Sequence, residues 1–296
     1  MPNAPHTPRN PRLSPVLGLA LLGLSACARD TTPARLLAPA NADAITYGWA
    51  DANNTYSNVG AFVVRRVSDG QVFPICSGTL ISATVFLTAG HCTAYFASLA
   101  PDKYVAGVSF DNPLAWGVLT DIHDKVAVAT SVITDPEYNQ RQSDPVDLGV
   151  LILAPRDTRG ISPATLPTLG LLDQLFVAGL LQGKQFTAVG YGLQNRVVGG
   201  GQPYNQDSNP IPRMYAFSSF NALGPAYLRL SQNPATGNGG TCYGDSGGPN
   251  FVNVGGSRVL AATTVTGDAV CRSTNVDYRL DTPTARRFLG QYVPLP

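Results

Sequence analysis

A histidine, an aspartate and a serine stand in three short segments whose residue types suit acyl transfer. His91 lies in the segment TAGHC, Asp147 opens the segment DLGVLIL, and Ser246 lies in the segment GDSGGP. A serine hydroxyl attacks a carbonyl when a base takes its proton and a carboxylate orients that base. A glycine-rich turn can also expose backbone N–H groups to the oxyanion that forms. Together the three segments indicate a serine nucleophile with its supporting groups.

Each segment alone also has an ordinary structural interpretation. A single histidine is usually structural, an aspartate before a strand usually caps a turn, and a serine between glycines is usually a turn residue. The joint arrangement favours chemistry, because histidine, aspartate and serine follow one another at intervals of 56 and 99 residues. Intervals of this size suit a base and its carboxylate on one structural unit and the nucleophile on the next.

The same segments resemble the three signatures of the trypsin-like (chymotrypsin-family) serine proteases. The segment Cys76–Ile81 (CSGTLI) resembles the family's strand before the histidine, and Val189–Gly192 (VGYG) resembles its Gly-Trp-Gly turn, with tyrosine replacing tryptophan. The resemblance extends from about Ile45 to the C-terminal region. It implies an all-β fold of two six-stranded antiparallel β-barrels with a short C-terminal helix.

The resemblance also implies the role of each site residue. Ser246 would attack the scissile carbonyl, His91 would take and return its proton, and Asp147 would hold the histidine in the useful tautomer. The backbone N–H groups of Gly244 and Ser246 would form the oxyanion hole. Substrates would be proteins or peptides, and we expect neither a cofactor nor a metal.

Two disulfides and an activation pair follow from the same resemblance. The chain has five cysteines. The family pattern predicts the bridges Cys76–Cys92 and Cys242–Cys271, which leaves Cys27 as the odd one. In family zymogens a newly freed N-terminal ammonium pairs with the aspartate before the nucleophile. Here those residues would be Ile45 and Asp245, and the alternative is that Ile45 only starts a strand.

The substrate-side-chain pocket is expected to be uncharged. The family positions for its floor and walls correspond to Gly240, Thr241, Gly267 and Val276. A valine wall would shorten the pocket and favour small or medium apolar side chains. A register shifted by one residue would instead bring the acidic Asp277 into it.

The composition favours strands and turns as the elements that hold these residues. The chain has 296 residues, of which 13% are charged, and contains 30 Gly and 24 Pro. Short apolar or alternating runs bounded by turn residues predict strands over 60–67, 72–75, 79–88, 125–133, 148–153, 185–189, 227–230, 258–265 and 276–280. One helix is predicted over 285–292, with Asp281 or Thr282 as its cap and Pro283 in its first turn. The net charge of +1 argues against a nucleic-acid partner.

The N-terminus has the pattern of an export signal. Arg9 and Arg12 precede the apolar run Val16–Leu24, which is too short to span a bilayer, and small residues follow. Cleavage after Ala28 would define residues 1–28 as a signal peptide. Alternatively, LSAC ending at Cys27 resembles the bacterial lipoprotein box, whose cysteine is lipidated and tethers the protein to the membrane.

The rest of the chain divides at about residue 160. Residues 29–44 are predicted to be a linker or pro-segment, 45–160 a barrel carrying His91 and Asp147, and 161–296 a barrel carrying Ser246 and the helix. The sequence thus predicts a secreted or extracytoplasmic, monomeric serine endopeptidase made as a zymogen. The alternative is an inactive binding protein on the same scaffold. A serine esterase is disfavoured, because its triad would follow another chain order.

Overall fold

The computed structural model describes residues 45–115, 117–118, 126–155, 157–193 and 209–296. All of them belong to one compact unit, Pro39–Pro296. The predicted signal peptide, the predicted linker and Cys27 lie outside the described residues. None of the helices in the described ranges has the length and apolar character needed to cross a bilayer.

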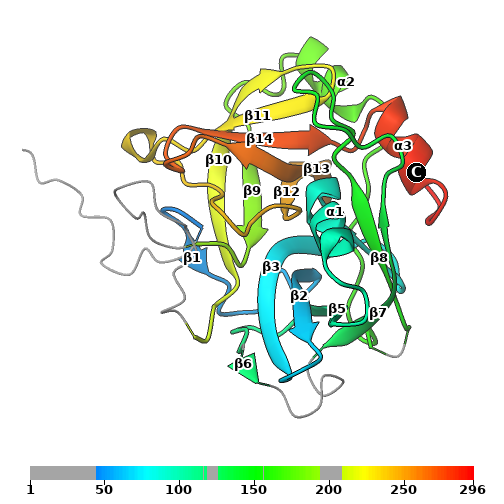
Figure 1. Cartoon of the computed structure of the whole chain (residues 1–296). Coiled ribbons are helices and arrows are strands. Elements are labelled where there is room, and N and C mark those ends of the chain that lie inside the picture. Colours follow the sequence, from blue (N-terminus) through cyan, green and yellow to red (C-terminus); the bar gives the residue numbers. More distant parts are fainter. Residues whose placement is uncertain (1–44, 116, 119–125, 156, 194–208) are drawn as a thin grey trace, which may run out of the picture. The chain divides into compact units, whose positions relative to one another are not determined.

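Six strands of the N-terminal half close into an antiparallel barrel (Figure 1). They are β2 (Val59–Arg66), β3 (Gln71–Leu80), β4 (Val85–Thr88), β5 (Tyr104–Ser109), β7 (Ala127–Thr134) and β8 (Gly149–Leu153). Their order is β2-β5-β7-β8-β4-β3, and pairing between β3 and β2 closes the ring. The two-residue strand β6 (Gly117–Val118) adds to β3 outside the ring.

Six strands of the C-terminal half form a second barrel. They are β9 (Gln185–Gly190), β10 (Met214–Leu223), β11 (Tyr227–Ser231), β12 (Pro249–Val254), β13 (Ser257–Gly267) and β14 (Thr274–Arg279). Their order is β10-β11-β14-β13-β12-β9, and pairing between β9 and β10 closes the ring. The predicted pair of six-stranded antiparallel barrels is confirmed.

Each barrel encloses its own apolar core, and a third core joins the two. Phe62, Phe86 and Val108 are fully buried in the first barrel, whereas Phe186 and Leu230 are fully buried in the second. Closure pairs every strand edge, so the inward side chains of all six strands can fill one interior. The joining core takes residues from strands of both barrels and from the C-terminal helix.

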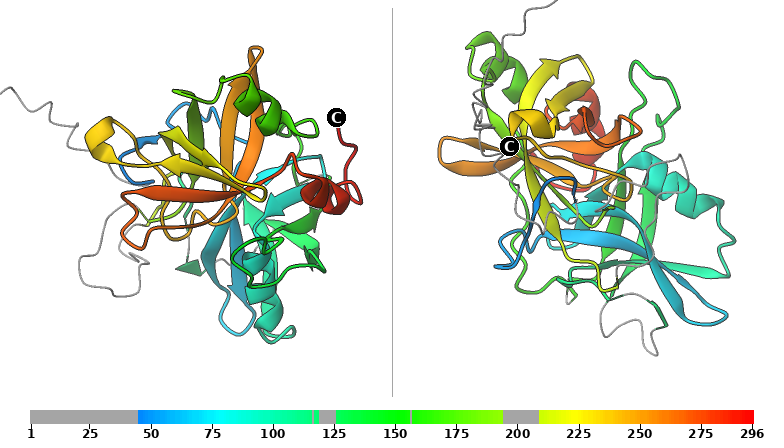
Figure 2. Two further views of the ribbon diagram at one scale, coloured as in Figure 1. Left: turned by 90° about the horizontal axis from the view of Figure 1, so that it is seen from above. Right: turned by 90° about the vertical axis from the view of Figure 1, so that its left-hand side faces the viewer.

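Within the described residues, three α-helices accompany the barrels. They are α1 (Gly90–Ser98), α2 (Leu171–Val177) and α3 (Pro283–Leu289), and a 3₁₀ turn, η2, spans Pro234–Thr236. Helix α3 was predicted. The Thr282 hydroxyl caps it by accepting a hydrogen bond from the backbone of Ala285. Figure 2 shows α3, in red, beside strands of both barrels, where Phe288 and Leu289 enter the joining core.

Several elements differ from the sequence-based expectation. The run predicted as one strand over 79–88 is the end of β3 and the whole of β4. The Ser82 hydroxyl turns the chain between them by accepting hydrogen bonds from the backbone N–H groups of Thr84 and Val85. Strands β5, β10 and β12 and helices α1 and α2 were not predicted.

The first described residues join the sheet of the second barrel. Strand β1 (Trp49–Ala50) pairs with β10, and Thr46 forms a bridge with Gly240. The buried Asp51 accepts a hydrogen bond of 2.9 Å from the guanidinium of Arg213, which is fully buried. A buried ion pair requires close geometry to offset its desolvation, so this contact fixes the course of the segment.

Candidate active site

His91 and Asp147 meet at the end of the β4–β8 ladder. Thr88, the last residue of β4, pairs with Gly149, so the residues just beyond that pair are neighbours. The Asp147 carboxylate accepts two hydrogen bonds from His91, one of 2.7 Å from its backbone N–H and one of 2.8 Å from Nδ1. The aspartate is buried, whereas a third of the histidine side chain is exposed. The carboxylate therefore fixes the ring and leaves its other nitrogen available.

The turn that carries Ser246 lies against the same strand end. The Ser246 carbonyl accepts a hydrogen bond of 2.9 Å from the backbone N–H of Ser77 on β3. Gly247 has a left-handed φ of 81°. A side chain there would collide with the Thr88 hydroxyl, with the Ser77 carbonyl and with the backbone of Ala89. The absence of a side chain at Gly247 thus lets the serine turn approach the residues that precede His91.

Both predicted disulfides are present. Cys76–Cys92 joins β3 to α1, and Cys242–Cys271 joins the serine turn to the loop before β14. The Cys76 and Cys92 sulfurs and a ring nitrogen of His91 all lie within 4.8 Å of one another. Such a cluster could suggest a metal site, but both sulfurs are committed to the disulfide. The first bridge therefore braces the helix turn that carries the histidine.

The backbone N–H groups of Gly244 and Ser246 have no hydrogen-bond partner within the described parts of the chain. In the two peptide groups that contain them, the carbonyls are occupied. Tyr243 O accepts from Leu193 N, and Asp245 O accepts from Gly248 N, each at 2.8 Å. Because N–H and C=O point in opposite directions in a planar trans peptide, these bonds fix the direction of both free donors. The arrangement suits an oxyanion.

Asp245 is fully buried behind the turn. Its carboxylate accepts hydrogen bonds from the backbone of Gly192 at 2.8 Å and of Cys242 at 2.9 Å. Burial raises the pKa of Asp245 to about 7, and these two hydrogen bonds only partly oppose that rise. Ile45 is also fully buried, and its side chain packs against Ala188 and neighbouring residues of the second barrel.

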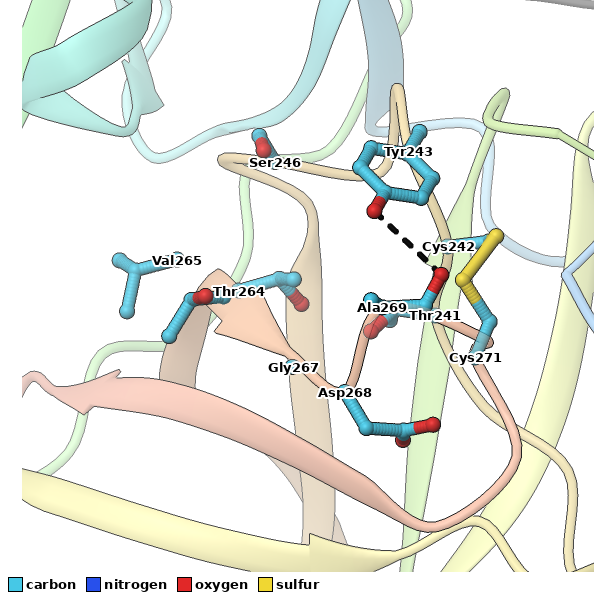
Figure 3. A pocket seen from close by; sticks show the side chains of 11 residues that line it. Thr241, Cys242, Tyr243, Ser246, Thr264, Val265, Gly267, Asp268, Ala269 and Cys271 are labelled. Carbon is cyan, nitrogen blue, oxygen red and sulfur yellow. Dashed lines mark hydrogen bonds between the residues drawn. A yellow bond between two sulfur atoms is a disulfide. The ribbon is translucent and has the colours of Figure 1, made fainter. Parts of the chain in front are cut away.

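A cavity of about 230 Å³ opens beside Ser246 (Figure 3). Thr241 and Gly267 line it, as expected. Gly240 and Val276 are not among its lining residues. The other residues around the cavity are Cys242, Tyr243, Ser246, Thr264, Val265, Thr266, Asp268, Ala269 and Cys271.

Two acidic residues lie near this cavity, and both are occupied by internal hydrogen bonds. The Asp268 carboxylate accepts from the backbone N–H groups of Arg272, Ser273 and Thr274. Burial alone would raise the pKa of Asp268, but these hydrogen bonds together lower it. Asp277 is fully buried and accepts from Asn250 at 2.6 Å, and its burial raises its pKa well above the ordinary value. Asp268 is therefore bound to its own loop, and burial favours the neutral form of Asp277.

The sequence analysis missed several lining residues, Val265 among them. On β13, Thr264 pairs with Asp277 and Thr266 pairs with Val276, so Val265 is an extra residue in a β-bulge. A bulge re-aims the side chains around it. No turn residue at the bulge itself reveals it in the sequence, so Val265 could not be predicted as a lining residue. The lining cysteines could have been, because they form a predicted disulfide.

Comparison with known proteins gives two similarities. The family model for trypsin matches residues 51–288. The chain is also 27% identical over 186 residues to a protein named serine protease SP24D from Anopheles gambiae. That alignment covers 60% of this chain and 58% of the mosquito protein, so the chain spans somewhat more than half of its relative.

The contact at Gly247 generates a stability prediction. We expect Gly247→Ala to lower the free energy of unfolding by at least about 2 kcal/mol, because the methyl group adds a clash to left-handed strain. Gly179→Ala is the matched control, since Gly179 has a φ of 70° with nothing near its missing side chain. The control should lose only about 1 kcal/mol. Urea unfolding measures both, and equal losses would contradict the close approach.

Proposed function

Because the chain belongs to the trypsin family of serine proteases, we propose that it is a secreted serine endopeptidase in which His91, Asp147 and Ser246 form the catalytic triad. The observation that carries the proposal is the two-point contact between His91 and Asp147 beside a serine turn with two free N–H donors. The printed name of the mosquito relative, a serine protease, agrees with it. The two disulfides are typical of exported proteins.

The proposed reaction proceeds in two halves. Ser246 Oγ attacks the peptide carbonyl while His91 takes the hydroxyl proton, and the resulting oxyanion accepts from Gly244 and Ser246 N–H. The C–N bond then breaks, His91 gives its proton to the leaving amine, and an acyl-enzyme forms. Water next attacks the acyl group with His91 as base, which releases the carboxylic acid and restores the serine. Asp147 stabilises the histidine in its charged form throughout.

The catalytic proposal predicts loss of activity with Ser246. We expect a phosphonylating reagent to label Ser246 and abolish peptidase activity in the processed protein. Ser246→Ala should lower kcat about 10⁶-fold. Mass spectrometry of the labelled peptide and hydrolysis of chromogenic peptides measure the two effects. A processed protein that is labelled but cleaves neither peptides nor esters would instead be the inactive binding protein.

We also propose that cleavage before Ile45 completes the site. An ammonium at Ile45 would supply the charge that the buried Asp245 lacks, since an unpaired buried charge costs several kcal/mol. In support, Ile45 is already buried, and the backbone beside it pairs with Gly240 six residues before the serine. If Cys27 is lipidated, the same cut would sever a tether of 17 residues, 28–44, and release a soluble enzyme.

Activation should change how stability depends on pH. In the uncleaved chain the pKa of Asp245, about 7, exceeds its unfolded value of about 3.9. The neutral carboxyl is therefore favoured by folding, and the free energy of unfolding should fall by about 3 kcal/mol as pH rises from 4 to 7. Pairing with the Ile45 ammonium would lower the pKa of Asp245 in the folded state. The stability of the processed form should therefore not show this decrease with pH.

The measurement is denaturant unfolding between pH 4 and 8 on three chains, all carrying Ser246→Ala to prevent self-cleavage. They are the precursor, the precursor with Asp245→Asn, and a chain that begins at Ile45. The free energy of unfolding should fall more steeply with rising pH in the first chain than in the other two, because any contribution of the buried Asp277 is common to all three. An active preparation that begins at Cys27 or Ala28, with Ile45 still inside the chain, would refute the activation mechanism and leave the triad untouched.

For specificity, we propose an uncharged side chain at the cleaved position, small or medium and apolar. Support comes from the two acids near the cavity. Asp268 is held by backbone donors, and Asp277 is fully buried with a raised pKa, so neither carboxylate is readily available to a basic side chain. The wall proposed from the sequence, Val276, pairs with the lining residue Thr266.

Specificity is tested with chromogenic peptides that differ only at the cleaved residue. Ala, Val and Leu should give a higher kcat/KM than Arg or Lys. The variant Asp268→Asn separates the two interpretations, because it should leave the order of preference unchanged. A preference for Arg that Asp268→Asn removes would show that Asp268 binds the substrate.

A further inference from the structure

The serine turn contains three consecutive peptide groups, and the middle one lies between the two that carry the free donors. Its N–H, from Asp245, donates to the Cys242 carbonyl at 3.0 Å. Its carbonyl, from Gly244, accepts a hydrogen bond of 3.0 Å from the Ser77 hydroxyl. The outer carbonyls accept from backbone N–H groups. Of these three carbonyls, the Gly244 carbonyl is therefore the one whose described contact comes from a side chain, that of Ser77.

From this contact we infer that Ser77 is a positioning residue for the oxyanion hole, acting through the peptide that joins its two donors. The inference rests on the proposed peptidase function and extends it to a residue outside the triad. Gly244 has a left-handed φ of 94°, so its peptide groups are not restrained by a side chain of their own. The Ser77 hydroxyl, from outside the turn, therefore adds a second restraint on this peptide group.

Ser77 is well placed to act as that donor. It is fully buried, and its hydroxyl also accepts a hydrogen bond of 3.0 Å from the backbone N–H of Tyr191. The Tyr191 N–H occupies a lone pair of the hydroxyl oxygen, so the hydroxyl proton is directed to Gly244. The Ser77 backbone is fixed too, because its N–H donates to Ser246 O and its carbonyl accepts from the Thr88 hydroxyl.

The space around Ser77 leaves room for a hydroxymethyl group and little more. A side chain carbon at Gly190 would lie 3.0 Å from the Ser77 hydroxyl, and one at Gly248 would lie 3.3 Å from its Cβ. The two glycines thus form the walls of a site fitted to serine. Removing the hydroxyl would leave both the Tyr191 N–H and the Gly244 carbonyl buried without this partner.

The inference predicts that a Ser77 variant binds the transition state more weakly but binds the substrate as before. Removing one oxyanion donor costs about 10²- to 10³-fold in kcat, so loosening the peptide that aims both donors should cost less. We expect Ser77→Ala to lower kcat about 10-fold and to leave KM unchanged. A peptide aldehyde, which forms a tetrahedral adduct with the serine, should bind about 10-fold more weakly. The matching peptide alcohol, which forms no oxyanion, should bind as before.

Two further variants of the processed enzyme complete the experiment. Thr158→Val is the control, because the buried Thr158 hydroxyl also donates to a backbone carbonyl, that of Ala83 beyond the far end of β4. It should lower stability without changing kcat. Ser77→Gly removes the same hydroxyl without adding bulk, and its loss of kcat should match that of Ser77→Ala.

The outcomes separate this inference from the proposed function. Equal weakening of aldehyde and alcohol, or an unchanged kcat in a folded Ser77 variant, would overturn the positioning role while the peptidase proposal stands. A processed wild-type protein that cleaves no substrate would overturn both. A loss of kcat that Thr158→Val shares would show a general effect of stability and would also overturn the inference.

Discussion

Close packing of the serine turn against the end of β4 joins the two barrels where the proposed active-site residues lie. Gly247 permits this contact, because any side chain there would meet Thr88 and Ser77. Histidine and aspartate come from one barrel and serine from the other, so their relative position is set by this packing and by the core shared with α3. Each barrel can close independently, but the proposed triad exists only if they close against each other.

The buried carboxylates of the two barrels differ in whether a basic side chain accompanies them. Asp51 is matched by the guanidinium of Arg213, and Asp147 by the histidine it orients. Asp277 and Asp245 have no cation among their described hydrogen-bond partners, and burial raises the pKa of both. Asp51 and Asp147 thus have a basic partner, whereas burial favours the neutral form of Asp277 and Asp245. We propose that an ammonium at Ile45 would supply a cation to Asp245.

The local signatures could be recognised from sequence because they are short and chemically demanding. TAGHC, DLGVLIL and GDSGGP gave the triad candidates, and the family resemblance gave the two barrels and both bridges, whereas Thr282 and Pro283 themselves marked the start of the helix. Other features depend on contacts distant in the chain. The bulge at Val265 changes which residues face the cavity, and the Ser77 hydroxyl matters only because a turn 167 residues away places a carbonyl beside it. Helix α1 begins one residue before His91 without a capping side chain, so no local signal predicts it.

The anchoring of residues 46–51 determines what a cut before Ile45 would cost. Thr46 is held through Gly240 and Cys271, and Asp51 through Arg213, and none of these bonds involves the peptide that would be cut. The new chain end would therefore stay anchored to the second barrel, which carries Asp245, instead of moving as a free tail. Most of the entropy of ordering this segment is lost when the precursor folds. Cleavage before Ile45 could then affect the turn that carries Asp245 and Ser246 with little rearrangement of residues 46–51.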